Sequence, residues 1–158
     1  MNIKPYDRTA AVAYAEKWAN ARNPAYADFS NMGGDCTNFI SQCLVAGGMP
    51  MNISNPFGWY YQSHSRRSAS FTGVQFLYSF LTGNKRRGPF ARECNVAEAE
   101  PGDIIQLSFD GTSFSHSLLV VQGGADPLVS THSYDCFGRR LSSYTYAAAR
   151  ALHIMGAY

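Results

Sequence analysis

Residues 31–48, NMGGDCTNFISQCLVAGG, place a cysteine directly after two glycines and at the start of an apolar helical pattern. A helix N-terminus presents unpaired amide donors and the positive end of the helix dipole, and both stabilise a thiolate. The same amides can hold an oxyanion, and Gly33-Gly34 let a substrate carbonyl approach the backbone closely. Cys36 is therefore a candidate nucleophile, although its position alone fits a small buried packing residue equally well.

The spacing of the cysteines disfavours a disulfide or a metal site. None of Cys36, Cys43, Cys94 and Cys136 forms a CxxC pair, and no Cys/His pair has zinc-finger spacing. On one helix Cys36 and Cys43 would lie about 10 Å apart, beyond the ~7 Å limit for a disulfide. We predict that Cys43 packs in the core, that the last two are ordinary thiols, and that no metal is bound. No glycine-rich phosphate loop follows a strand, so no cofactor is expected.

A histidine in a later strand makes the nucleophile interpretation of Cys36 stronger. His116 stands near the start of the apolar pattern FSHSLLVV, beside serines. A single histidine in a strand is more often structural than catalytic. A helix that begins with cysteine and a later strand histidine are nevertheless what a thiolate–imidazolium pair requires.

Helical patterns come first along the chain and strand patterns follow. Asp7 can cap a helix over residues 8–20, and apolar residues at helical spacing predict a second helix from Cys36 to Val45. A long loop over 49–69 precedes a third helix near 71–81. The predicted strands lie within PGDIIQLSF, FSHSLLVV, PLVSTHS and ARALHIMGAY, with Asp110-Gly111 as a hairpin turn between the first two. Helices segregated from an antiparallel sheet define an α+β fold, and we expect residues 1–158 to form a single domain.

Charge and hydropathy exclude several kinds of partner. The formal net charge is +2 and the basic residues are scattered, so nucleic acid is not an expected partner. No stretch approaches the ~18 apolar residues of a membrane span. The chain as given opens without a signal peptide, so we expect a cytoplasmic protein, or a secreted one if the sequence is truncated or the protein is released by lysis.

Four motifs, in this order, resemble the putative amidase domain family of Gram-positive bacteria, relatives of papain-like cell-wall hydrolases of the NlpC and CHAP types. GGDCTNFISQ parallels the Asp-Cys-Ser-Gly-Phe-Val element of those enzymes, PGDIIQLSF their Gly-Asp strand opening and SHSLLVV their histidine strand, and VSTHSYD follows. The resemblance implies a papain-like fold in which N-terminal helices pack on a C-terminal antiparallel sheet. Thr37-Asn38 stand where the NlpC-type pattern has Ser-Gly, which favours the amidase family over that relative.

The function implied by this resemblance is cysteine-dependent hydrolysis of an amide bond, in a peptidoglycan peptide or a related amide. Cys36 would be the nucleophile that forms an acyl-enzyme, and His116 the general base and acid. Two alternatives stay open: an inactive papain-like module that binds wall peptides or glycans, and a transferase or deamidase that uses the same pair. We expect a monomer that needs no cofactor.

A third catalytic residue is predicted on the strand after His116, where papain-like enzymes carry the polar group that orients the histidine. The candidates are His132, Ser133 and Asp135. If the two strands pair about residue 124, His132 lies opposite His116, whereas a one-residue slip puts Ser133 there. We predict His132.

The remaining expectations concern the helix start and the substrate. The Cys36 amide is the natural oxyanion donor, and Asn31 or Tyr26 would supply the second. Asp35 is expected to stabilise the helix start by its charge. Trp59, in the long loop, would form one wall of the cleft.

Overall fold

The computed structural model describes residues 2–158 and confirms the predicted α+β fold. The helices are α1 (Arg8–Trp18), α2 (Cys36–Ala46), α3 (Ala69–Thr72) and α4 (Val74–Gly83). The strands are β1 (Pro89–Cys94), β2 (Ile104–Ser108), β3 (His116–Gln122), β4 (Leu128–Thr131), β5 (Cys136–Arg140) and β6 (Ala148–Ala157). Two short 3-10 turns are η1 (Val96–Glu98) and η2 (Leu141–Ser143).

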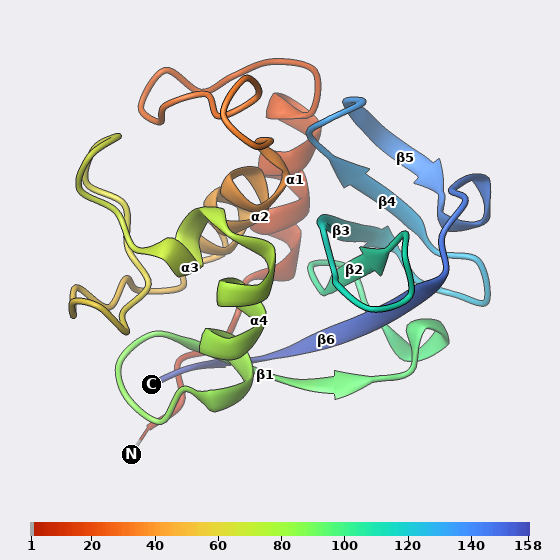
Figure 1. Ribbon diagram of the computed structural model, residues 1–158. Coiled ribbons are helices and arrows are strands. Elements are labelled where there is room, and N and C mark those ends of the chain that lie inside the picture. The colour runs from red at the N-terminus through yellow and green to blue at the C-terminus, as the bar shows by residue number, and fades with distance from the viewer. Residues whose placement is uncertain (1) are drawn as a thin grey trace.

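The strands form one antiparallel sheet in the order β1-β6-β2-β3-β4-β5. In Figure 1 the sheet lies on one side of the molecule and the helices on the other. An isolated bridge between Lys4 and Ala157 holds the beginning of the described chain against the end of β6. β1 and β5, which the sequence patterns did not predict, are the two edge strands, and their side chains are mostly half-buried or exposed.

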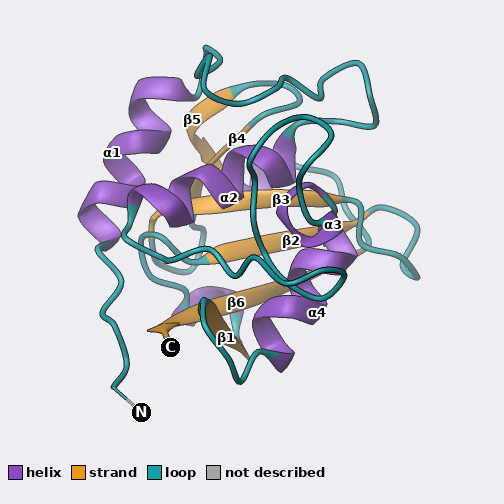
Figure 2. Cartoon of the chain, turned by 90° about the vertical axis from the view of Figure 1, so that its left-hand side faces the viewer, coloured by secondary structure: helices purple, strands orange, loops and turns teal. Residues whose placement is uncertain are grey.

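The two faces of the sheet carry separate apolar clusters, as the two-residue period of a strand requires. Ile104 and Leu119 belong to the larger cluster, which includes the buried faces of α1, α2 and α4. Ile105, Leu118 and Val129 belong to a smaller cluster on the opposite face, together with Leu141 and other residues. Figure 2 shows α2 lying across β3 on the helical side.

The helix α2 is the central element of the site. All residues from Cys36 to Leu44 are buried, so this helix is enclosed on every side rather than on one face. Cys43 is fully buried in the larger cluster, which confirms its packing role. The predicted third helix is interrupted at Gly73, whose extended backbone (φ −114°, ψ 132°) separates α3 from α4. Every helix described within residues 2–158 is too short or too polar to traverse a bilayer.

Candidate active site

A cavity of about 510 Å³ opens beside the N-terminus of α2, the first residues of β3 and the turn between β4 and β5. Both Cys36 and His116 line it, so the structure brings these two sequence-predicted residues to one opening. The other lining residues are Gly33, Gly34, Phe109, Ser115, Ser133, Tyr134, Arg139, Ser143, Tyr144 and Thr145.

Cys36 begins α2 directly after the glycine turn. Gly33 and Gly34 have φ angles of +93° and +108°, which glycine adopts without the steric cost that other residues meet. The Cys36 side chain is buried, with 7% of the residue exposed, and burial raises the pKa of its thiol. Hydrogen bonds from the Ser117 backbone and from Thr37 oppose this shift by stabilising the thiolate.

The early end of β4 explains how Ser117 reaches this sulfur. β4 stops at Thr131, so the ladder between β3 and β4 ends before it reaches the beginning of β3. The Thr131 hydroxyl donates to the Ser117 carbonyl at 2.8 Å, and the Ser117 and Thr37 hydroxyl oxygens lie 2.9 Å apart. The N-terminus of α2 therefore fits against the open edge of β3.

His116 is the first residue of β3 and is 8% exposed. It pairs with Leu107 across the ladder, which puts its imidazole on the face of the smaller apolar cluster. Burial, followed by the charge of Arg139, lowers the pKa of His116 from 6.5 to about 4. Together with the raised pKa of Cys36, these directions favour a neutral thiol and a neutral imidazole at pH 7, rather than the ion pair expected from the sequence.

Turn residues form the rim of the cavity. Phe109 and Tyr134 are 52% and 89% exposed, and both line the opening. Ser133 and Tyr134 have φ angles of 67° and 59°, a conformation that non-glycine residues rarely adopt and that often occurs at functional sites. Ser133 is one of the three candidates for the third catalytic residue, whereas the sequence patterns missed Phe109 and Tyr134, because turn residues carry no hydrophobic period.

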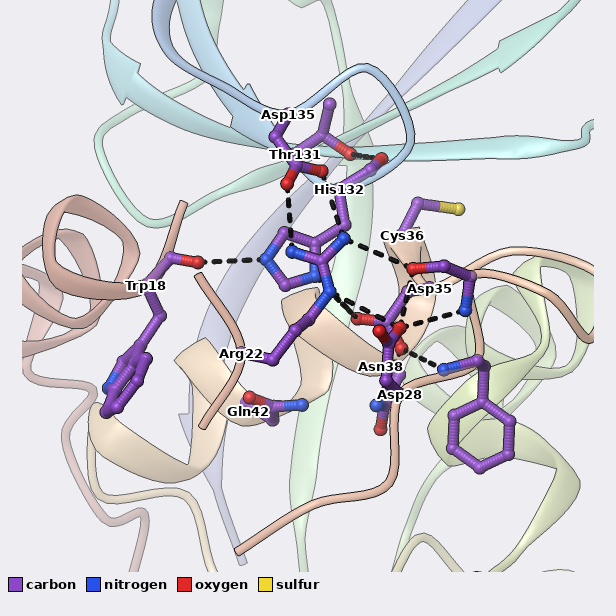
Figure 3. A network of polar contacts seen from close by, with 12 residues as sticks. Trp18, Arg22, Asp28, Asp35, Cys36, Asn38, Gln42, Thr131, His132 and Asp135 are labelled. Carbon is purple, nitrogen blue, oxygen red and sulfur yellow. Dashed lines mark hydrogen bonds and ion pairs between the residues drawn. The ribbon is translucent and has the colours of Figure 1, made fainter. Parts of the chain in front are cut away.

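A buried polar network lies behind the N-terminus of α2 (Figure 3). Asp35 and His132 are each 1% exposed, and their Oδ2 and Nδ1 atoms lie 2.5 Å apart. The second ring nitrogen, Nε2, lies 2.9 Å from the Trp18 carbonyl oxygen. Asp35 Oδ1 also accepts hydrogen bonds from the Phe29 amide and the Asn38 side chain.

Arg22 joins this network to the surface. Its guanidinium lies within ion-pair distance of Asp28, Asp35 and Asp135, and it donates to both carboxylate oxygens of Asp135. Asp135, one of the three candidates for the third catalytic residue, is thus held by Arg22. The network fixes the start of α2 against α1 and the end of β4.

The strand register expected for His132 is wrong by one residue. Leu119 pairs with Ser130 and Val120 with Val129, and a bulge between Val120 and Gln122 shifts the pairing beyond them. If the pairing of Leu119 with Ser130 is extended to the start of β3, position 133 falls opposite position 116. Both ring nitrogens of His132 contact Asp35 and Trp18, so its imidazole supports the start of α2 instead of contacting His116.

The other predicted substrate-binding residues lie away from the cavity lining. Trp59 is fully buried and donates from Nε1 to Ser41 Oγ at 3.1 Å, so it supports α2 from the core and forms no cleft wall. Tyr26 is half-buried, with its ring centroid 5.0 Å from that of Tyr61. Asn31 is exposed in the turn before Gly33 and is not a lining residue.

Within the described chain, one group of side chains has the spacing of metal ligands. Glu100, Asp103 and His153 offer ligand atoms within 4.8 Å of one another. The Arg8 guanidinium already occupies this group, with Nη1 2.8 Å from Asp103 Oδ1 and Nη2 3.5 Å from His153 Nδ1. The cluster therefore ties α1 to the sheet through a cation of the protein itself.

Comparison with known proteins agrees with the motifs around this cavity. A family model described as putative amidase domain matches residues 5–155. The chain belongs to this putative amidase family. One relative is the uncharacterized protein YhbB of Bacillus subtilis (strain 168), 42% identical over 135 residues, which cover 82% of this chain and 42% of YhbB. Another is the uncharacterized protein YjcM of the same strain, 47% identical over 49 residues, 31% of this chain and 12% of YjcM. The chain thus spans less than half the length of either relative, and no solved structure matches it significantly.

Proposed function

We propose that this protein is a cysteine-dependent hydrolase of amide bonds, with Cys36 as nucleophile and His116 as general base and acid. The observation that carries the proposal is that both side chains line one cavity. Membership of the putative amidase family supports the reaction class. The motif resemblance to NlpC-type and CHAP-type enzymes supports a papain-like relationship and a wall peptide as substrate.

The start of α2 provides the means to stabilise an oxyanion. The first amides of a helix have no acceptor inside the helix. The Asp35 side chain caps none of them, because its carboxylate accepts from Phe29 and Asn38 instead. The Cys36 amide is therefore free to donate to the oxygen of a carbonyl that the sulfur attacks.

The proposed reaction starts from a neutral thiol and a neutral imidazole. The Cys36 proton moves to His116 as the sulfur bonds to the carbonyl carbon and the oxygen becomes an oxyanion. The imidazolium then protonates the leaving nitrogen as the C–N bond breaks, which leaves a thioester. Water attacks the thioester and gives a proton to His116, and the carboxylic acid leaves as the thiol regains its proton.

An activated ester tests the nucleophile without knowledge of the natural substrate. With p-nitrophenyl acetate, we expect a burst of one p-nitrophenol per protein and an acetyl group on Cys36 by peptide mass mapping. Cys36→Ala should abolish the burst, and His116→Ala should slow it about 100-fold or more. Acetylation of Cys94 or of lysines instead would contradict the proposal. Added amines that capture the acetyl group faster than water would identify a transferase.

A further inference from the structure

Arg139 is the single formally charged side chain among the described residues that line the cavity. Its charge acts on His116, whose pKa it helps to lower. The side chain is half-buried, and its guanidinium carbon lies 3.7 Å from the centroid of the Tyr144 ring. A cation at this place shares the cavity with the proposed reacting groups.

A β-bulge in β5 points Arg139 toward the face of His116. Ser130 pairs with Phe137 and Val129 with Arg139, so Gly138 is an extra residue in β5, with φ +83°. Cross-strand partners share a face, and Val129 lies in the smaller apolar cluster on the same face as His116. Bulges of this kind commonly re-aim a side chain next to an active site.

Contacts inside the protein leave part of the Arg139 guanidinium free. Nε donates to the Ser143 hydroxyl at 2.7 Å and Nη2 to the Ser143 carbonyl at 3.2 Å. These two contacts fix the plane of the guanidinium, and the Tyr144 hydroxyl also interacts with it. No hydrogen bond of ordinary length within residues 2–158 is donated by Nη1. No carboxylate in the described chain lies within ion-pair distance of Arg139, whereas Arg22 has three.

We infer that Arg139 binds a carboxylate of the substrate, so that this site prefers a peptide-type amide with an acidic group close to the scissile bond. A guanidinium with a free edge suits a planar carboxylate, which can accept two parallel hydrogen bonds. The inference rests on the proposed function, because it assigns the carboxylate to the molecule that Cys36 attacks.

Two alkylating agents that differ in charge test this inference. Iodoacetate and iodoacetamide both form an Sγ–carbon bond as iodide leaves, but only iodoacetate carries a carboxylate. The rate of iodoacetate divided by the rate of iodoacetamide is measured at Cys36 by peptide mapping. This ratio is then normalised by the same ratio for the neutral thiol N-acetylcysteinamide. We expect the normalised ratio to exceed one in the wild type at low salt and to fall about fivefold in Arg139→Gln. Arg139→Lys should keep most of the preference because it keeps the charge.

Arg140→Gln is the matched control, since it removes a charge from the exposed neighbouring position on the same strand. It should leave the ratio unchanged. Equal ratios in the wild type and Arg139→Gln would overturn the inference, as would a wild-type ratio of one that does not respond to salt. This last measurement needs no variant. A Cys36 that fails to react with iodoacetamide would instead contradict the proposed function.

Discussion

The buried pair of Asp35 and His132 provides a prediction whose size follows from the structure. Asp35 Oδ2 lies 2.5 Å from His132 Nδ1, and Oδ1 accepts hydrogen bonds from the Phe29 amide and the Asn38 side chain. Asp35→Asn replaces one of these buried acceptor oxygens with an amide NH2 group, which can only donate, so a buried partner loses its acceptor. It also removes the carboxylate charge that lies 3.7 Å from Arg22 Nε. Removing one partner of a buried charged contact costs about 3–5 kcal/mol, so Tm should fall by about 6–20 °C for a chain of this length.

Asp135→Asn is the matched control for this experiment. Asp135 also pairs with Arg22, but its side chain is 28% exposed against 1% for Asp35, so its loss should cost at most about 1 kcal/mol. Urea unfolding of the wild type and both variants, followed by circular dichroism, gives the free energies of unfolding. A cost for Asp35→Asn no larger than that for Asp135→Asn would refute the claim that the buried contacts of Asp35 hold the start of α2 in place.

Three further predictions concern the cavity and its support. Since the pKa of His116 is lowered from 6.5 to about 4, the unfolded chain takes up the proton first as pH falls. The wild type should therefore lose about 3 kcal/mol of stability between those values, and His116→Gln should lose less in parallel urea titrations. Trp59→Ala should cost about 3–5 kcal/mol in unfolding free energy, because the ring is fully buried, while Tyr134→Ala at the cavity mouth should cost below about 0.5 kcal/mol. Equal costs would contradict this division between core and rim. Cys36→Ala should abolish turnover and keep the circular dichroism spectrum of the wild type. A changed spectrum would mean that the loss of turnover comes from a change of fold and not from the missing sulfur.

Strong apolar periodicity explains which elements the sequence predicted. The helix from Cys36 and the strand that contains His116 both pack against the core, and their predicted limits agree with α2 and β3 within about two residues. The edge strands β1 and β5 bury fewer side chains, so their sequences carry a weaker pattern. Gly73 divides the predicted third helix, a local break that the apolar pattern of residues 71–81 does not reveal.

The candidate site was predictable only in part, because apolar periodicity reveals the elements that carry its residues but not the strand register or the bulges that orient them. Cys36 and His116 stand at the ends of strongly patterned elements, and the structure places both on one cavity. The position of His132 depended on strand register. Gln122 pairs with Leu128 beside the hairpin, which centres it on residue 125 instead of 124, and a bulge in β3 then moves the pairing by one residue, neither with a signal in the hydrophobic pattern. Arg139 depends on the second bulge, at Gly138, whose glycine is the one sequence feature that could have indicated it.

The pH dependence of Cys36 alkylation by iodoacetamide, in the wild type and His116→Ala, tests the central claim most directly. If His116 accepts the thiol proton, the wild type should react at a rate that is steady from about pH 5 to pH 8. That reactivity should fall as pH drops toward about 4, where His116 becomes protonated, and it should be absent in His116→Ala. Cys136, a free thiol in the same protein, serves as an internal control whose rate should be equal in both proteins. A Cys36 rate that rises only near or above pH ~9, identically in both proteins, would contradict the claim that these two residues act together.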